Sequence, residues 1–245
     1  MRLCLFIEDD MGFMILKYLT SNYPDHVCHV VIRKEMESVY SDRMSSGYTW
    51  ETYDDETTPK NIKSLDVDFV LLAWWPKIVS ALVIESVKIG VINLHPSMLP
   101  FNRGKHYWFW NLVEDKPYGV SIHFVDTSID GGDIIFQREI PKSWEDTGQS
   151  LFDKARIEML SLFIESYPKI ANLDYTRIKQ PPSGTYHNSS ELHRASEISL
   201  RKKYTAKELL NLLRARVSKK YEQCYFFDED GTKYEVGIDI KKVED

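Results

Sequence analysis

Two polar side chains stand one residue apart in the stretch INLHPSMLPFNRG, which covers residues 92–104. The stretch begins like a buried strand, and because side chains alternate across a strand, Asn93 and His95 are expected to project from the same side. An asparagine offers a hydrogen-bond donor of short reach, and a histidine donates, accepts or exchanges a proton near neutral pH. This pair suits a reaction that develops an oxyanion and moves a proton, as acyl transfer to an amine does.

A carboxylate in a second segment, DTSIDGGDII at residues 126–135, is a candidate third member of this group. Asp130 precedes two glycines, which permit a tight turn and a close approach of the backbone to a ligand. A carboxylate at this position could orient His95 or a water molecule. The sequence therefore predicts an Asn–His–Asp site assembled from two segments.

Each of these residues also has an ordinary structural interpretation. Asn93 suits a buried amide bonded to backbone, His95 suits a core histidine, and Asp130 suits a turn. A metal site of His95, His123 and Asp130 is disfavoured, because the three lie on different expected elements and no H-x-H or H-E-x-x-H pattern joins them. No metal is expected in the reaction.

The elements that must position these residues predict an α/β domain with a mostly parallel, Rossmann-like sheet flanked by helices. Residues 34–64 are polar and weakly periodic, so loops and a short helix are expected there. Strands are expected at residues 2–7, 26–32, 67–75, 90–95, 118–126 and 132–140, and helices at 11–23, 80–88, 106–115 and 147–170.

The chain is expected to divide into a catalytic domain at residues 1–172, a linker at 173–190 and a small C-terminal subdomain at 191–245. The linker contains the turn-forming cluster PPSG at residues 181–184. The subdomain is α+β, with one helix and a terminal β-hairpin whose turn contains Asp230 and Gly231. No G-x-G-x-x-G follows the first strand, so a dinucleotide site is not expected.

Composition sets broad limits on partners and location. The 245 residues carry a net charge of −6, which argues against a protein that coats nucleic acid. Cys4, Cys28 and Cys224 are widely spaced and predict reduced thiols. Acids follow the first apolar run, and the longest apolar stretch ends at Pro76, short of the ~18 residues of a membrane span. We expect a cytoplasmic protein with no membrane or nucleic-acid partner.

The two segments NLHPSMLPFNRG and GVSIHFVDTSIDGGDII together resemble the formyltransferases that use N10-formyltetrahydrofolate. The family pattern is Asn-x-His-Pro-Ser-x-x-Pro, then Gly-x-x-x-His, then an Asp before a turn of small residues. The resemblance runs over residues 65–140. It implies that Asn93, His95 and Asp130 are the catalytic trio and that His123 is a further histidine of the second motif. It also implies a cis bond between Leu99 and Pro100.

The resemblance further implies a mechanism and a formyl donor. The amine of an acceptor attacks the formyl carbon of N10-formyltetrahydrofolate, Asn93 and His95 stabilise the oxyanion, and His95, oriented by Asp130, assists proton transfer. The pterin is expected in a cleft formed partly by backbone, at Ala73, Trp74, Trp75, Pro76, Thr127, Ser128, Ile129 and Asp130.

The acceptor is expected to be an amino sugar linked to a nucleotide. The chain continues too far past residue 172 for a glycinamide ribonucleotide formyltransferase, and not far enough for the barrel domain of a methionyl-tRNA formyltransferase. The segments at residues 101–110 and 192–217 resemble the nucleotide-sugar branch. This implies a dTDP-linked or UDP-linked sugar, foremost a dTDP-amino-dideoxyhexose for O-antigen or another surface glycan, and a homodimer formed through C-terminal elements.

Other functions stay open at this point. They are formylation of methionyl-tRNA, hydrolysis of the formylfolate, and binding of folate or nucleotide without catalysis. The candidate acceptor-binding residues are Lys77, Arg103, Lys105, His106, His123, Tyr221 and Tyr225. Lys77 also suits a surface lysine, and the two tyrosines also suit hairpin packing. A solvated helix face is the first interpretation for most of the basic residues at 201, 202, 203, 207, 214, 216, 219 and 220.

Overall fold

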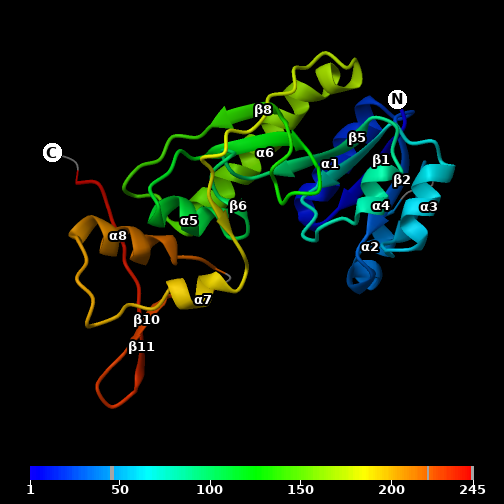
Figure 1. Cartoon of the computed structure of the whole chain (residues 1–245). Coiled ribbons are helices and arrows are strands. Elements are labelled where there is room, and N and C mark those ends of the chain that lie inside the picture. Colours follow the sequence, from blue (N-terminus) through cyan, green and yellow to red (C-terminus); the bar gives the residue numbers. More distant parts are fainter. Residues whose placement is uncertain (45–46, 220, 244–245) are drawn as a thin grey trace. The chain divides into compact units, whose positions relative to one another are not determined.

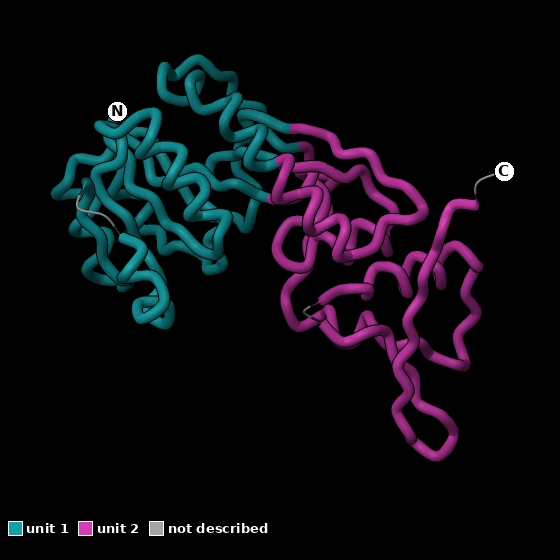
Figure 2. Tube along the Cα trace, turned by 180° about the vertical axis from the view of Figure 1, so that it is seen from behind, with its two compact units in different colours: residues 1–95, 121–137, 159–180 teal, residues 96–120, 138–158, 181–245 magenta. Residues whose placement is uncertain are grey.

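The computed structural model describes residues 1–44, 47–219 and 221–243, and Figure 1 labels its helices and strands. The chain forms two compact units, which Figure 2 distinguishes by colour. The first unit contains residues 1–95, 121–137 and 159–180, and the second contains residues 96–120, 138–158 and 181–245. The chain passes repeatedly between the units, and the division expected at residues 172 and 190 stays a prediction.

In the described part of the chain, seven strands form the main sheet in the order β3-β2-β1-β4-β5-β7-β8. Its strands are β1 (Leu3–Ile7), β2 (Val27–Ile32), β3 (Thr49–Thr52), β4 (Phe69–Ala73), β5 (Gly90–His95), β7 (Gly119–Phe124) and β8 (Ile134–Glu139). The strands from β3 to β5 pair in parallel, whereas β7 pairs antiparallel with β5. The expected fold class, a mostly parallel Rossmann-like sheet with a C-terminal hairpin, is confirmed.

Helices cover both faces of this sheet. They are α1 (Asp9–Asn22), α3 (Thr57–Ser64), α4 (Ala81–Glu85) and α6 (Gly148–Ala171). The short helix α2 (Glu37–Tyr40) packs beside α1, where Tyr40 meets Phe13 with ring centroids 4.9 Å apart. The helix α1 packs on the face that carries Ile7, and a Cβ added to Gly12 would lie 2.9 Å from the Cβ of Ile7. The side chains of Tyr18 in α1 and Phe163 in α6 meet edge to face, with ring centroids 6.2 Å apart. The strand β1 is therefore buried on both sides, as its apolar sequence requires.

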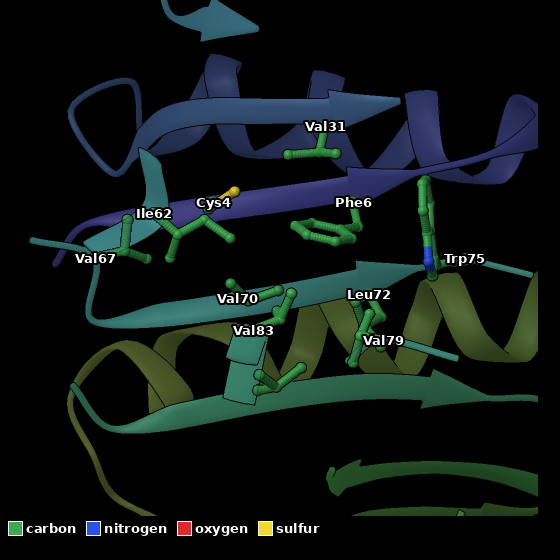
Figure 3. Packing of buried hydrophobic residues seen from close by; sticks show 11 residues of the cluster. Cys4, Phe6, Val31, Ile62, Val67, Val70, Leu72, Trp75, Val79 and Val83 are labelled. Carbon is green, nitrogen blue, oxygen red and sulfur yellow. The ribbon is translucent and has the colours of Figure 1, made fainter. Parts of the chain in front are cut away.

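The opposite face holds an apolar cluster that α3 and α4 cover, seen in Figure 3. Phe6 of β1 and Trp75, just after β4, lie in this cluster with ring centroids 5.1 Å apart. Ile62 of α3 and Val83 of α4 close it from outside, and both are fully buried. This packing fixes the carboxyl ends of β1 and β4 relative to each other.

Acidic residues occupy the start of α1. The Glu8 carboxylate accepts two hydrogen bonds from the guanidinium of Arg33, at 2.8 and 2.6 Å. Asp10 forms an ion pair with Arg43 at 3.2 Å. Carboxylates thus stand at the positive end of the helix dipole, where this type of fold often binds phosphate.

The second unit contains short elements, several of which the sequence did not predict. They are β6 (Arg103–Gly104), α5 (Tyr107–Val113), β9 (Tyr186–His187), α7 (Glu191–Ala195), α8 (Ala206–Ala215), β10 (Cys224–Phe227) and β11 (Lys233–Val236). The hairpin of β10 and β11 is confirmed. Within the segment expected as a linker, β9 pairs with β6. Residues 34–64, where loops and a short helix were expected, contain β3 and two helices, α2 and α3. These strands are two to four residues long and polar, so they carry little apolar pattern.

Two of the basic residues assigned to a solvated face are buried. Arg214 donates hydrogen bonds to the carbonyl oxygens of Ser143, Trp144 and Asp146, at 2.7 to 3.2 Å. Arg216 is also buried. The solvated-face interpretation is therefore wrong for these two, and Lys220 lies outside the described residues.

Two further expectations concern single features. The bond between Leu99 and Pro100 is cis, as the resemblance implied. Among the described residues, no helix combines the length and apolar character that crossing a membrane demands.

A histidine between two carboxylates ties β9, α5 and α7 together within the second unit. The His187 ring stacks on Trp110 with centroids 3.7 Å apart, and its two nitrogens contact Glu114 at 2.8 Å and Glu191 at 2.9 Å. Burial opposes charging, but the bonds to both glutamates outweigh it and raise the pKa of His187 above its ordinary 6.5. Burial would also raise the pKa of Glu114, yet its hydrogen bond to His187 lowers that pKa overall.

Replacing His187 with Gln should destabilise the protein in a pH-dependent manner. Because the folded-state pKa is raised, the stabilisation is fully present below pH 6.5 and is lost as the pH rises through the folded pKa. We expect His187→Gln to lower the free energy of unfolding by about 2 kcal/mol near pH 6 and by less near pH 9. Urea unfolding at both pH values measures this, and an equal loss at both would contradict it.

Candidate active site

The strand β5 brings Asn93 and His95 to one side near its carboxyl end. Asn93 is half-buried, and only 5% of His95 is exposed. The antiparallel pairing of β5 with β7 sets Asn93 directly opposite His123 and His95 opposite Ser121. The expected common orientation of the amide and the imidazole is thus built by strand geometry, and the neighbouring strand adds a second histidine.

His123 is a neutral, fixed hydrogen-bond acceptor. Its Nδ1 lies 2.7 Å from the carbonyl oxygen of Phe124, which only accepts, so Nδ1 carries the proton. Its Nε2 therefore presents a lone pair and accepts from Asn93 Nδ2 at 3.2 Å. Burial lowers the pKa of His123 to about 4, and the nearby Asp130 offsets only part of that effect. With 1% of its surface exposed, His123 is placed to hold Asn93.

Asp130 reaches the same two residues from the loop between β7 and β8. Its Oδ1 accepts from Asn93 Nδ2 at 3.3 Å, and its Oδ2 lies 3.5 Å from His95 Nδ1. The backbone of Asp130 is left-handed, with φ of 49°. A Cβ at Gly132 would lie 2.0 Å from the carbonyl oxygen of Phe124, so this close approach admits only glycine. The Gly-Gly turn thus folds the carboxylate back onto β5.

The segment at residues 177–180, which follows α6, fastens this loop, and no motif or periodicity indicated this role. The Gln180 side-chain amide donates to the carbonyl oxygens of Asp130 and Gly132, each at 2.8 Å. Ile178 exchanges two backbone hydrogen bonds with Ile134. Arg177 bonds Asp133 at 3.1 Å. The loop that carries Asp130 is therefore held on both sides of its glycines.

The expected pterin-binding residues occupy two different environments. Ala73 and Trp75 are buried in the core, so only their backbone is available to a ligand. Trp74 between them has a left-handed backbone, with φ of 66°, and Pro76 is half-buried. Residues 127–129 are exposed next to Asp130. This distribution fits the expected recognition of a planar ring by backbone groups, and the assignment remains a prediction.

The expected acceptor-binding residues are divided between the two units. Lys77 lies in the first unit and pairs with Glu35 at 3.1 Å. The others of this group, apart from His123, belong to the second unit: Arg103, Lys105, His106, Tyr221 and Tyr225. Their part in a common site stays a prediction.

Aromatic contacts distinguish the two tyrosines of this group. Tyr221 stacks on Trp108 with centroids 5.4 Å apart, and His106 meets it edge to face at 5.5 Å. Tyr225 is 3% exposed, and its hydroxyl lies 3.1 Å from His193 Nε2. Burial favours hairpin packing over base stacking for Tyr225.

The amide of Asn93, the imidazoles of His95 and His123 and the carboxylate of Asp130 thus converge near the carboxyl end of β5. Such a fold and site define a class of α/β proteins that can polarise a carbonyl group and exchange a proton. The chain belongs to the formyl transferase family, whose pattern matches residues 19–166. Residues 191–242 match the N-formyltransferase dimerization C-terminal domain.

Two curated relatives carry different names. A methionyl-tRNA formyltransferase of Lactobacillus johnsonii is 31% identical over 155 residues, which are 63% of this chain and 49% of that protein. A dTDP-4-amino-4,6-dideoxyglucose formyltransferase of Mycobacterium bovis is 28% identical over 159 residues, 64% of this chain and 67% of the relative. The chain thus spans about half the length of the first relative and about two thirds of the second.

Two solved structures share the fold. A 4-N formyltransferase from Francisella tularensis superposes with a TM-score of 0.85 at 24% identity, covering 99% of this chain and 98% of that one. An N-formyltransferase from Helicobacter canadensis, in complex with folinic acid and dTDP-3-aminofucose, has a TM-score of 0.73 at 22% identity, covering 94% and 85%. At these identities the likeness concerns the fold.

The neutrality of His123 should be visible as a loss of stability in acid. Because its folded-state pKa is about 4, below the ordinary 6.5, unfolding takes up a proton as the pH falls between these values. Lowering the pH from 7 to 5 should therefore reduce the free energy of unfolding by about 2 kcal/mol through this histidine. In His123→Gln, we expect the loss of stability between pH 7 and pH 5 to be smaller than in the wild type by that amount, as measured by urea unfolding. An NMR titration of the His123 ring with a midpoint near 6.5 would exclude the assignment.

Proposed function

We propose that this chain is an N-formyltransferase that moves the formyl group of N10-formyltetrahydrofolate to the amine of a nucleotide-linked amino sugar. The observation that carries the proposal is the contact of Asn93 with both His123 and Asp130, beside His95. Membership of the formyl transferase family supports the reaction type and the formyl donor.

The geometry suggests how the residues divide the work. As the amine attacks the formyl carbon, the carbonyl oxygen becomes negative and needs a donor. Both N–H groups of Asn93 are engaged in this structure, and the longer contact, 3.3 Å to Asp130, is the one that the oxyanion would replace. Release of Asp130 from Asn93 leaves its carboxylate to His95, 3.5 Å away.

His95 is the group placed to accept a proton from the attacking nitrogen. A carboxylate beside Nδ1 favours the tautomer with the proton on Nδ1, which leaves Nε2 with a lone pair. It also stabilises the imidazolium that forms when Nε2 takes the proton from the amine. The bond from the formyl carbon to N10 of the folate then breaks, and tetrahydrofolate leaves with the proton returned to N10. Because His95 is buried, its contact with the carboxylate and its contact with the amine are both stronger than they would be in water.

The formyl donor fits the exposed side of this cluster. Residues 127–129 and the backbone around Trp74 offer polar groups without large charged side chains. The Helicobacter canadensis protein, which shares the fold, was crystallised with folinic acid and dTDP-3-aminofucose. We extend this pairing of a folate with a dTDP-linked sugar to the present chain.

An amino sugar is favoured over methionyl-tRNA as acceptor. The C-terminal part matches the dimerization domain of N-formyltransferases, which also supports a homodimer. The net charge of −6 does not favour tRNA. We propose a dTDP-amino-dideoxyhexose, used for O-antigen or a similar surface glycan. Methionyl-tRNA is the second candidate, because the Lactobacillus johnsonii relative carries that name.

A panel of acceptors tests the proposal directly. The purified chain is incubated with N10-formyltetrahydrofolate and dTDP-linked or UDP-linked amino sugars, methionyl-tRNA, or buffer. Mass spectrometry should detect one formyl group on a dTDP-amino sugar. Formylation of methionyl-tRNA alone would establish the second candidate, and release of folate in buffer at the same rate would indicate a hydrolase.

Substitution of Asn93 should remove the chemistry while the fold persists. We expect Asn93→Ala to lower kcat by about 100- to 1,000-fold, as loss of an oxyanion donor does elsewhere. The exposed His193 provides a matched control, and His193→Gln should keep full activity. Wild-type kcat in a folded Asn93→Ala protein would show that the site is placed incorrectly.

Gln180 should act as a positioning residue for Asp130. Gln180→Glu and Gln180→Met keep the side-chain length and remove the amide donors that hold the two loop carbonyls. We expect kcat to fall by about tenfold or more with little change in the KM of the acceptor, because a displaced group slows the chemical step. The neighbouring exposed Lys179 supplies the control, Lys179→Met. An unchanged kcat in both Gln180 variants would refute this role.

A further inference from the structure

The ligand atoms of His95, His123 and Asp130 converge in space although their elements are separate in sequence. One ligand atom of each lies within 4.8 Å of the other two, and within the described residues this is the one group of His, Cys, Asp or Glu that does so. The distances to Asp130 are 3.5 Å from His95 Nδ1 and 3.7 Å from His123 Nε2. Ligands of tetrahedral zinc, with bonds of about 2.0–2.1 Å, lie roughly 3.3 Å apart.

We propose that these three residues bind a zinc ion when the site holds no substrate, and that the ion inhibits the enzyme. Two histidines and one carboxylate form a donor set that zinc takes with a fourth position left to water. The inhibition rests on the function proposed above, whereas the binding of zinc does not. The chemistry of formyl transfer itself needs no metal.

His123 is already oriented as a metal-binding histidine. Zinc ligation by Nε2 requires a lone pair there, and the hydrogen bond from Nδ1 to the carbonyl oxygen of Phe124 provides it. Histidine ligands of metals commonly donate their other nitrogen to such a carbonyl or to a carboxylate. Only 1% of the His123 side chain and 16% of the Asp130 side chain are exposed, so little water competes for these donors.

The amide of Asn93 marks the position of the ion. Its Nδ2 lies 3.2 Å from His123 Nε2 and 3.3 Å from Asp130 Oδ1, so its partly positive N–H groups face two of the same donor atoms. A zinc ion would take over both donor atoms and displace the amide. It would remove the oxyanion donor and occupy the carboxylate that faces His95. Because ligation by Nδ1 of His95 needs a lone pair there, the proton of this imidazole would move to Nε2, which could then no longer accept one from the amine. These changes explain why the ion inhibits rather than assists.

The donor atoms lie next to an exposed loop. Residues 126–129, directly before Asp130, are exposed. The pterin is expected to bind next to this loop, so a folate and the zinc ion should compete for the site. The sequence disfavoured a metal here because no spaced motif joins the donors, and only strand pairing and the Gly-Gly turn bring them together.

Calorimetry with zinc chloride tests the binding without reference to turnover. Chelator-treated protein should bind one zinc ion per chain, and 5-formyltetrahydrofolate should weaken the binding. His123→Gln and Asp130→Asn should each lose more than about 100-fold in affinity, because even loss of an outer partner of a ligand costs about 10- to 100-fold. His193→Gln should bind zinc like the wild type. Far-ultraviolet circular dichroism confirms that each variant is folded.

Two results would overturn the proposal. Zinc affinity within a factor of about three of wild type in both folded variants would place the ion elsewhere. Full formyl transfer by the wild type at saturating zinc would show that the bound ion does not inhibit. Inhibition by zinc that EDTA reverses supports the proposal. If no acceptor is formylated at all, the zinc affinities of the variants still show whether the ion binds at these three residues.

Discussion

The reversed direction of β7 is the constraint on which the proposed site depends. In an all-parallel sheet the strand beside β5 would be separated from it by a crossover, whereas the antiparallel pairing sets Asn93 face to face with His123. The same reversal turns the following loop back over β5, so that Asp130 reaches both Asn93 and His95. Slipping this register by one residue would move the two histidines to opposite faces and dissolve the cluster.

Apolar periodicity was sufficient to predict the central part of the fold. The strands β1 and β4 are fully buried and appear as continuous apolar runs. The strands β2 and β5 are mostly apolar and mostly buried, with His29 in β2 and with Asn93 and His95 in β5. The strand β3 lies at the edge of the sheet with the sequence TWET, which presents no such run. The short strands β6 and β9 depend on each other across more than eighty positions of chain, and local sequence does not encode that contact.

The site could be predicted only in part. Alternation along β5 placed Asn93 and His95 together, and the Gly-Gly turn after Asp130 marked it as a candidate third member, to which the family resemblance assigned a catalytic role. The function of His123 as an acceptor for Asn93 needed the register between β5 and β7. The contribution of Gln180 could not be foreseen, because it lies in an irregular segment fifty residues from Asp130 and acts through backbone carbonyls. The spacing of residues in the sequence therefore indicates which side chains are reactive, whereas the tertiary structure is needed to identify the residues that position them.

The acidic start of α1 has a consequence for how this scaffold can evolve. Carboxylates fill the end of β1, where related sheets seat a phosphate, and Arg33 and Arg43 are engaged with them. Because these two arginines are already paired, an anionic substrate at that edge would have to compete with the carboxylates for them. Conversion into a dinucleotide-binding protein with the G-x-G-x-x-G motif would need glycines in place of Glu8, Asp10 and Phe13. The ion pairs of Glu8 and Asp10 would be lost as well, so such a change of ligand is several substitutions away.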